Sequence, residues 1–329
     1  FLRTVSFVDC PGHHSLMVTM LSGAALMDGA LFVIASNSKC PQAQDREHMA
    51  AAQISSMKNI VIVQNKIDVV DRGRAIENLS EIVNFVKGTE AEHSPIVPVS
   101  AQHKLNIDRL IQAIEERIPT PNRDLSAHPL MYVLRSFDIN KPGTNAEDLK
   151  GGVIGGSVVK GFFRVGDKIE IRPGVRVESG GRPRYEPLIT SIQSLQVGRG
   201  PVTEARCGGL IGVGTNLDPS LTKSDGLVGS VVGKVGMLPD ALERLILEVQ
   251  LFETAVGTEE MTPVEKIRTN EPVVLNVATT VTSGTVTSSR EDKVEVSLKK
   301  PICSDKGAKV VVSRRIGDSW RLIGYGTIL

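Results

Sequence analysis

The sequence is poor in several features that would each point to a definite class of protein. Aromatic residues make up only 4% of the 329 residues, and 38 Lys and Arg residues balance 37 Asp and Glu residues to a net charge of +1. A surface for nucleic acid or anionic lipid must therefore be a local patch. The four cysteines are scattered and form no CxxC pair. This spacing argues against a zinc site or a disulfide framework and favours the reducing cytoplasm.

Long hydrophobic runs are also missing. The longest apolar stretch, residues 16–35, is interrupted by Gly23, Asp28 and Gly29. It predicts a helix followed by a buried strand rather than a membrane span, and we expect no membrane partner. The chain begins at Phe1 inside a run that is typical of an interior strand. We therefore expect an upstream portion of the protein to be missing.

Three regions differ in their periodicity. Residues 1–121 alternate apolar strand patterns with helical ones, which predicts an α/β domain: a parallel sheet with helices on both faces, incomplete at its N-terminus. Its predicted strands are 5–8, 30–35, 59–64 and 96–99, and its predicted helices are 15–21, 45–56, 75–87 and 107–117. Pro119 and Pro121 predict a linker. Short β-type runs separated by glycines then predict two antiparallel β-barrel domains, 122–238 and 239–329.

The first candidate site follows the first predicted strand. Asp9 and Gly12 form a DxxG pattern there. A carboxylate at a strand end can reach a Mg²⁺-bound water, and a glycine lets its N–H approach a terminal phosphate. His13 is placed to orient the water that attacks a γ-phosphate, as a Gln does in related enzymes. The pattern alone also fits an ordinary strand-to-helix turn, with His13 as a polar residue of the first helical turn.

The second candidate site follows two later strands. Asn65, Lys66 and Asp68 form an NKxD pattern after the strand 59–64, and Ser100, Ala101 and Gln102 follow the strand 96–99. Residues at the carboxyl ends of parallel strands meet in the ligand crevice. An Asp carboxylate can accept both N–H groups on the guanine edge, Asn65 can bond the base edge, the Lys66 stem can cover the ring, and backbone N–H groups after Ser100 can meet O6. Each pattern alone also describes a polar loop.

The order of the patterns carries more weight than any one of them. DxxG, NKxD and SA occur in succession, each at the end of a predicted parallel strand. Together they predict a domain that binds GTP and GDP with Mg²⁺, in which Asp9 contacts the metal through a water. The phosphate-binding pattern GxxxxGK[ST] is absent from the sequence. We expect it in the missing upstream portion, although its loss from the protein would explain the sequence as well.

Longer phrases of the sequence resemble a known family. The phrases DCPGH, LSGAALMDGALFVIA, CPQAQDREH, IVQNKID and PIVPVSAQHKLNID resemble the translational GTPases. The phrases RSFDINKPG, LKGGVIGGSVVKG, GGLIGVGTNLDPSLTKSD and SRRIGDSWRLIGYG are similar to the gamma subunits of translation initiation factor 2. The resemblance implies a GTPase whose hydrolysis of GTP to GDP and phosphate is triggered by a partner.

The resemblance further implies a set of partners. Gamma subunits form the core of a heterotrimer with an alpha subunit on the second domain and a beta subunit on the GTPase domain. They bind initiator methionyl-tRNA and deliver it to the small ribosomal subunit in the mRNA-bound initiation complex. The implied site residues are Asp9, Gly12 and His13 for the γ-phosphate switch, and Asn65, Lys66, Asp68, Ser100 and Ala101 for the base.

Two other functions remain open on the sequence alone. A selenocysteine-specific elongation factor shares the GTPase patterns, although it is expected to have a further C-terminal domain and to lack the phrase RSFDINKPG. A non-hydrolysing scaffold for the alpha and beta subunits would need no phosphate loop.

Residues 290–321 carry nine basic and five acidic residues, so this stretch is either a patch for tRNA phosphates or a solvated face.

Overall fold

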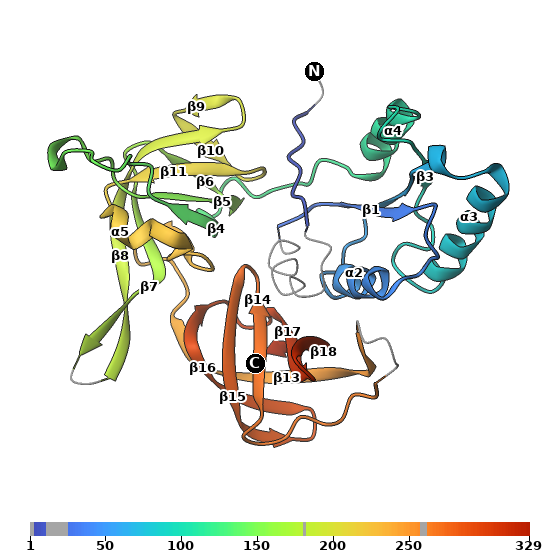
Figure 1. Ribbon diagram of the computed structural model, residues 1–329. Coiled ribbons are helices and arrows are strands. Elements are labelled where there is room, and N and C mark those ends of the chain that lie inside the picture. The colour runs from blue at the N-terminus through green and yellow to red at the C-terminus, as the bar shows by residue number, and fades with distance from the viewer. Residues whose placement is uncertain (1–2, 11–25, 180–181, 257–261) are drawn as a thin grey trace.

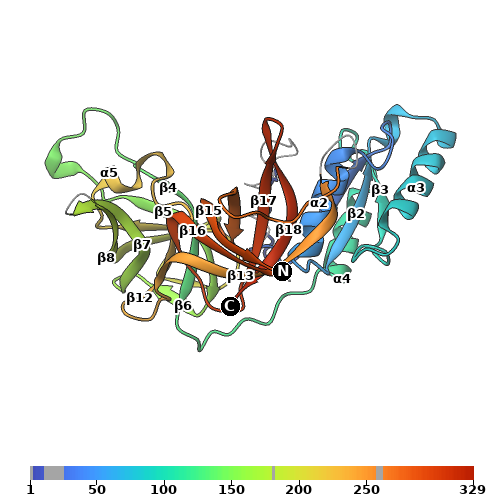
Figure 2. The ribbon, with the colours of Figure 1, turned by 90° about the horizontal axis from the view of Figure 1, so that it is seen from below.

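Three structural units follow one another along the chain in the computed structural model, which describes residues 3–10, 26–179, 182–256 and 262–329. Figure 1 shows the α/β unit on the right, a β-barrel on the left and a second barrel below them. From below, the second barrel lies between the other two units (Figure 2). None of the described helices is long and apolar enough to span a membrane.

The α/β unit contains a parallel sheet with the strand order β1-β2-β3. Its strands and helices are β1 (Ala30–Ala35), α2 (Ala43–Ile54), β2 (Ile60–Asn65), the short η2 (Ile67–Val69), α3 (Arg72–Val86), β3 (Ile96–Pro98) and α4 (Ile107–Arg117). Alternate residues of β2 face opposite ways: Ile60 and Ile62 pack in a core with residues of α2 and α3, while Val61 and Val63 pack with residues of α4. Helices therefore cover both faces, and the α/β prediction is confirmed.

The predicted strand 5–8 is wrong. Residues 3–10 have no regular structure, and Val5, Phe7 and Val8 are 43%, 69% and 39% exposed. A strand needs a neighbour for its ladder of hydrogen bonds, and within the described residues this segment pairs with none. Its apolar sequence alone could not supply that partner. The predicted helix 15–21 lies outside the described residues.

The first barrel begins after the linker. Its strands are β4 (Leu130–Phe137), β5 (Val153–Lys160), β6 (Phe162–Arg164), β7 (Lys168–Ser179), β8 (Arg182–Val197), β9 (Gly200–Val202), β10 (Glu204–Arg206), β11 (Ile211–Thr215) and β12 (Val231–Lys234). Pairing of β11 with β8 closes the ring β11-β5-β4-β12-β7-β8. A Cβ on Gly156 would lie 1.9 Å from the carbonyl oxygen of Tyr132. Gly156 of β5 thus serves close packing of the backbones of β4 and β5.

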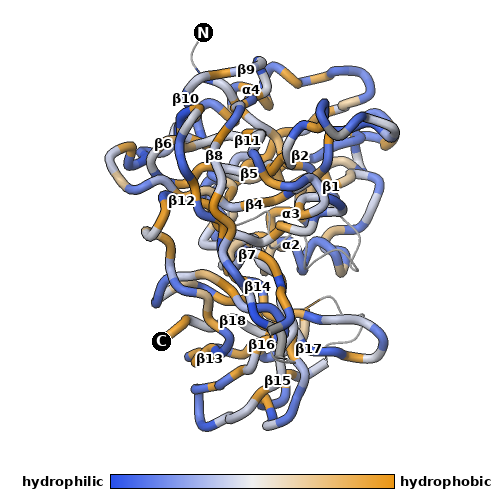
Figure 3. Tube along the Cα trace, turned by 90° about the vertical axis from the view of Figure 1, so that its left-hand side faces the viewer, coloured by the Kyte–Doolittle hydropathy of each residue, from blue (hydrophilic) through white to orange (hydrophobic). Residues whose placement is uncertain are grey.

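The second barrel is a closed ring of six described strands in the order β13-β16-β15-β14-β17-β18. They are β13 (Ala241–Val256), β14 (Pro272–Val277), β15 (Thr280–Arg290), β16 (Lys293–Cys303), β17 (Lys309–Ile316) and β18 (Ser319–Ile328). Figure 3 shows hydrophobic and hydrophilic positions mixed along these strands, and in β13 buried and exposed residues alternate from Leu245 to Gln250. The apolar pattern of the sequence predicts strands at 245–251, 273–278, 293–298, 309–313 and 320–325 but none at β15, whose residues are mostly Thr and Ser rather than large apolar ones.

The two barrels are joined by polar contacts. Lys300 Nζ donates to the carbonyl oxygen of Val228 at 2.9 Å, and Thr280 Oγ1 donates to that of Gly229 at 2.5 Å. Burial lowers the pKa of Lys300. Arg172, on the first barrel, pairs with Asp240 at 2.8 Å where the chain enters the second. These contacts fix one barrel against the other.

A buried junction joins α2 to the second barrel. Arg321 of β18 pairs with Glu47 of α2 at 3.0 Å, and the two side chains are only 17% and 4% exposed. Ala51 and Ile54 of α2 share an apolar cluster with Val311 and Leu322 of the barrel. Burial raises the pKa of Glu47 although Arg321 opposes the shift. The ion pair thus compensates a carboxylate that the junction has removed from water.

Arg321→Ala should destabilise this junction. The change leaves Glu47 buried without its partner, which typically costs about 3 kcal/mol of unfolding free energy. Thermal denaturation should show a lower midpoint, and amide hydrogen exchange should rise in α2. Arg315→Ala is the control, since its partner Asp318 is fully exposed and such pairs contribute less than about 1 kcal/mol. Equal midpoints for the two variants would contradict the account.

Candidate functional site

Asn65 connects two loops at the carboxyl edge of the parallel sheet. Its Oδ1 accepts the backbone N–H of Lys66 at 2.8 Å and that of Ala101 at 3.2 Å. Strands β2 and β3 are parallel neighbours, with Gln64 opposite Pro98, so the loops that follow them lie side by side. Lys66 has a φ of 63°, a left-handed conformation that turns the chain sharply after β2. The structure therefore brings the NKxD and SAQ segments together.

Asp68 presents its carboxylate at this junction. The Ser100 hydroxyl donates a hydrogen bond to it, and this contact is the main reason that the pKa of Asp68 is lowered. Ser100 is itself fully buried and its Oγ accepts the backbone N–H of His103 at 3.2 Å. The hydroxyl is thus held by a backbone group while it orients the carboxylate. Near neutral pH Asp68 is ionised and can only accept hydrogen bonds.

The chemistry of this edge suits a base with two adjacent donors. An ionised carboxylate accepts two N–H groups side by side, and guanine offers N1–H and N2–H₂ whereas adenine has no such pair. Lys66, Ala101 and Gln102 lie on the same two loops, and all three are exposed. Their side chains are thus accessible to a ligand. Their individual roles toward the base stay predictions.

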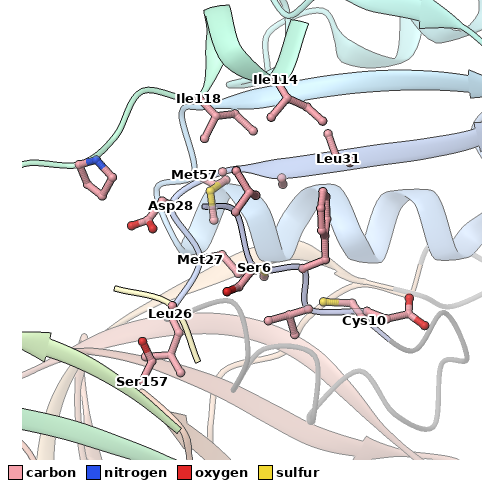
Figure 4. Close-up of a pocket in the computed structure, with 18 of the residues that line it drawn as sticks. Ser6, Cys10, Leu26, Met27, Asp28, Leu31, Met57, Ile114, Ile118 and Ser157 are labelled. Atoms are coloured by element: carbon pink, nitrogen blue, oxygen red, sulfur yellow. The ribbon is translucent and has the colours of Figure 1, made fainter. Parts of the chain in front are cut away.

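Asp9 lies elsewhere. It lines a cavity of about 640 Å³ beside β1, together with Cys10, Met27, Leu31 and residues of α4, and none of the base-site residues lines it. Figure 4 shows Cys10, Met27 and Leu31 around this space, with Ile114 and Ile118 above. The structure does not gather Asp9 with Asn65 and Asp68. Gly12 and His13 lie outside the described residues.

No group of three or more His, Cys, Asp or Glu side chains among the described residues could hold a metal ion. The contact of Asp9 with Mg²⁺ through a water stays a prediction.

The basic stretch 290–321 does not form one exposed patch. Four of its nine basic side chains are used inside the molecule. Lys300 bonds the first barrel, Lys309 Nζ bonds Ile54 O and Ser56 Oγ of the α/β unit, Arg314 pairs with Glu271, and Arg321 pairs with Glu47. Neither a free phosphate patch nor a solvated face therefore describes Lys300, Arg314 and Arg321, whereas Lys309 stays exposed while it bonds the α/β unit. Sequence spacing cannot show which side chains enter a junction.

The sequence analysis missed a polar cluster behind the site. Arg74 and Asn78 of α3 donate to the carbonyl oxygen of Ser38 at 2.7 and 3.1 Å, and Glu81 accepts the Cys40 N–H at 2.9 Å. The hydrogen bond from Arg74 lowers the pKa of Glu81. This cluster holds the loop after β1 against α3. No spacing pattern in the sequence could have identified it, because its members come from two separate elements.

Comparison with family models assigns all three units. The elongation factor Tu GTP binding domain matches residues 2–120, elongation factor Tu domain 2 matches residues 151–232, and the C-terminal part of initiation factor eIF2 gamma matches residues 243–328. The three matches follow the same order as the three units of the structure.

Comparison with curated proteins gives close relatives. Translation initiation factor 2 subunit gamma of Archaeoglobus fulgidus is 59% identical over 99% of this chain and 76% of its own length. The subunit of the same name from Methanocaldococcus jannaschii is 56% identical over all of this chain and 80% of its own length.

Solved structures share the fold at much lower identity. The elongation factor SelB of Methanococcus maripaludis has a TM-score of 0.75 at 19% identity, over 97% of this chain and 69% of that one. A bacterial selenocysteine-specific elongation factor has the same TM-score at 20% identity, over 97% of this chain and 47% of its own. At these identities the likeness shows the fold alone.

Asp68→Asn should change which base the site accepts. The variant loses two charge-assisted hydrogen bonds to guanine, so GDP affinity should fall at least about 100-fold. The Asn carboxamide can donate to the C2 carbonyl of xanthine, so xanthosine diphosphate should bind better than GDP. Fluorescent analogues of both nucleotides measure this, on protein that carries any residues its gene encodes upstream of Phe1.

The control for this change is Asp318→Asn, an equally conservative change at a fully exposed carboxylate of the second barrel. It should leave both affinities unchanged. An Asp68→Asn variant that still prefers GDP would contradict the assignment of the base site.

Proposed function

The chain belongs to the gamma-subunit family of translation initiation factor 2, a family of translational GTPases, and from this premise we propose its task in detail. The protein binds GTP and initiator methionyl-tRNA together and delivers the tRNA to the small ribosomal subunit within the mRNA-bound initiation complex. Hydrolysis of GTP to GDP is the switch that releases the tRNA. The proposed place of action is the cytoplasm.

The observation that carries this proposal is the ionised Asp68 carboxylate, oriented by Ser100 beside a loop that Asn65 ties in place. Asp68 accepts the two N–H groups of guanine, and the Ala101 region provides backbone donors for O6. Lys66 covers the ring and Gln102 borders it. A switch that reports GTP concentration needs this discrimination, because ATP is present in the same compartment.

The phosphate groups of GTP are assigned to a second set of residues. Asp9 would hold Mg²⁺ through a water molecule, Gly12 would offer its N–H to the γ-phosphate, and His13 would orient the attacking water. This GTPase domain comprises residues 1–121, and the two β-barrel domains comprise residues 122–238 and 239–329. Mg²⁺ supplies charge neutralisation at the phosphates when it is bound. The trigger for hydrolysis comes from a partner, which in other GTPases increases the rate by several orders of magnitude.

Two exposed apolar surfaces suit the partner subunits. On α3, Ile76, Leu79 and Val83 are 54%, 38% and 42% exposed, and their spacing places them along one stripe of the helix. Figures 1 and 2 both show α3 on the side of the α/β unit that faces away from the barrels. We assign this stripe to the beta subunit.

The alpha subunit is assigned to the first barrel. The connection between β4 and β5 projects at the outer end of this barrel (Figure 2). Phe137, Ile139 and Leu149, in or beside this connection, are 41%, 47% and 48% exposed. Exposed apolar side chains that gather in one loop are typical of a protein interface.

Binding of initiator methionyl-tRNA tests the proposal. With a non-hydrolysable GTP analogue the labelled tRNA should bind tightly, and with GDP it should bind much more weakly, because the switch segment reports the γ-phosphate. Fluorescence anisotropy measures both affinities on protein that carries any upstream residues of its gene, with elongator methionyl-tRNA as the control.

The two alternative functions predict different results. Equal or absent tRNA binding in both nucleotide states, with the alpha and beta subunits still bound, would support a non-hydrolysing scaffold. Preference for selenocysteinyl-tRNA would support the selenocysteine-specific elongation factor, whose solved relatives share the fold of this chain.

The α3 stripe has its own test. Ile76→Asp combined with Val83→Asp should weaken binding of the beta subunit at least about tenfold, since charges at the centre of an apolar interface are strongly unfavourable. Isothermal titration calorimetry measures the affinity. The control is Ile111→Asp on α4. Ile111 is 56% exposed and lies outside the stripe, so this variant should bind the beta subunit normally. If the control lost affinity as much as the double variant, the stripe would not be the interface.

A further inference from the structure

His103 lies beside the carboxylate that reads the base. Its Nε2 is 3.7 Å from Asp68 Oδ2, and the two side chains are 68% and 21% exposed. The backbone of the same residue donates to Ser100 Oγ, which in turn bonds Asp68. The loop that orients the carboxylate therefore also positions an imidazole next to it. Nothing in the motif patterns of the sequence assigns a role to this histidine.

The imidazole and the base compete for the same acceptor. A histidine side chain changes charge between about pH 5 and about pH 8. In its protonated form it attracts the ionised carboxylate across 3.7 Å, and its positive charge competes with the N1–H and N2–H₂ donors of guanine for that carboxylate. In its neutral form this attraction disappears and the carboxylate is fully available. Protonation and base binding are then linked, and each opposes the other.

We propose that His103 is a pH-sensitive regulator of guanine binding at Asp68, so that protonation of the imidazole weakens nucleotide affinity. This inference rests on the proposed base site and adds a regulation of it. Binding of the nucleotide expels a proton, and an acidic environment shifts the protein toward its nucleotide-free form.

The surroundings leave Asp68 as the charged partner of the imidazole. The other charged side chains on the loops and first helical turns of this edge are Lys66, Asp71, Arg72, Arg74, Lys104, Asp108 and Arg109. All are exposed except Arg74, which pairs with Glu81. Within the described residues none of them forms an ion pair or hydrogen bond with the imidazole, whereas Asp68 does lie within ion-pair distance. The hydrogen bond from Ser100 lowers the pKa of Asp68. The carboxylate therefore stays ionised where histidine titrates, and its own protonation does not produce the effect.

The test compares the pH dependence of GDP affinity in wild-type protein and in His103→Gln. Wild-type affinity should fall about two- to five-fold more than that of the variant between about pH 8 and about pH 5, the range expected for an exposed ion pair. Ionisation of the nucleotide phosphates affects both proteins equally, so only the difference between the two profiles is interpreted.

Two further measurements sharpen the test. Calorimetry near pH 6 in two buffers of different ionisation enthalpy should show proton release on GDP binding that is larger in wild type than in His103→Gln. His93→Gln, a change at an exposed histidine outside the site, is the control and should behave as wild type. His103→Arg, which carries a permanent cation, should bind GDP more weakly than His103→Gln at every pH.

The outcomes separate this inference from the function on which it rests. Parallel pH profiles and equal proton release in wild type and His103→Gln, with normal GDP affinity, would overturn the role of His103 and leave the base site intact. Loss of guanine preference in all proteins would instead overturn the base site itself. An affinity that rises on protonation would also refute the proposal, since it would show that the imidazolium assists the base.

Discussion

The hydrogen bonds accepted by the Asn65 side chain hold the base site together. One acceptor oxygen takes the N–H of Lys66 on its own loop and that of Ala101 on the neighbouring loop. Everything proposed about base recognition depends on these loops keeping their relative position. The parallel register of β2 and β3 brings the two loops near each other. The carboxamide of Asn65 then fixes the distance between the loops through its two hydrogen bonds. Asp68, Ser100 and His103 acquire their geometry only within this frame.

The α/β unit is connected to the rest of the molecule through α2. Cys10, next to Asp9, packs against the apolar cluster that α2 shares with Leu322 and Val311 of the second barrel. A buried cluster of this kind is close-packed and resists continuous deformation. Any displacement of the segment around Asp9 must therefore repack the junction or move the barrel. Because Lys300 and Thr280 bind the second barrel to the first, such a movement would carry both barrels together.

Sequence patterns predicted those helices and strands that depend mainly on residues close together in the sequence. The limits of β1 and α4 agree with the sequence periodicity, since each has a continuous apolar or amphipathic pattern and a clear end. The NKxD and SAQ segments were expected to meet because parallel strands end at one edge, and the structure brings them together. What sequence could not provide were effects of distant neighbours: the missing strand pairing of residues 5–8, the polar strand β15, and the burial of Lys300 and Arg321 in junctions.

The Asn65 side-chain oxygen holds together the loops that are proposed to bind guanine, and substitutions of Asn65 test this directly. The measurement is amide hydrogen exchange at Lys66 and Ala101, together with GDP affinity, in Asn65→Ala and in Asn65→Asp, which keeps the acceptor oxygen. The account predicts faster exchange at both amides and a large loss of affinity in Asn65→Ala, with Asn65→Asp retaining the slow exchange. Unchanged exchange and affinity in Asn65→Ala would contradict it.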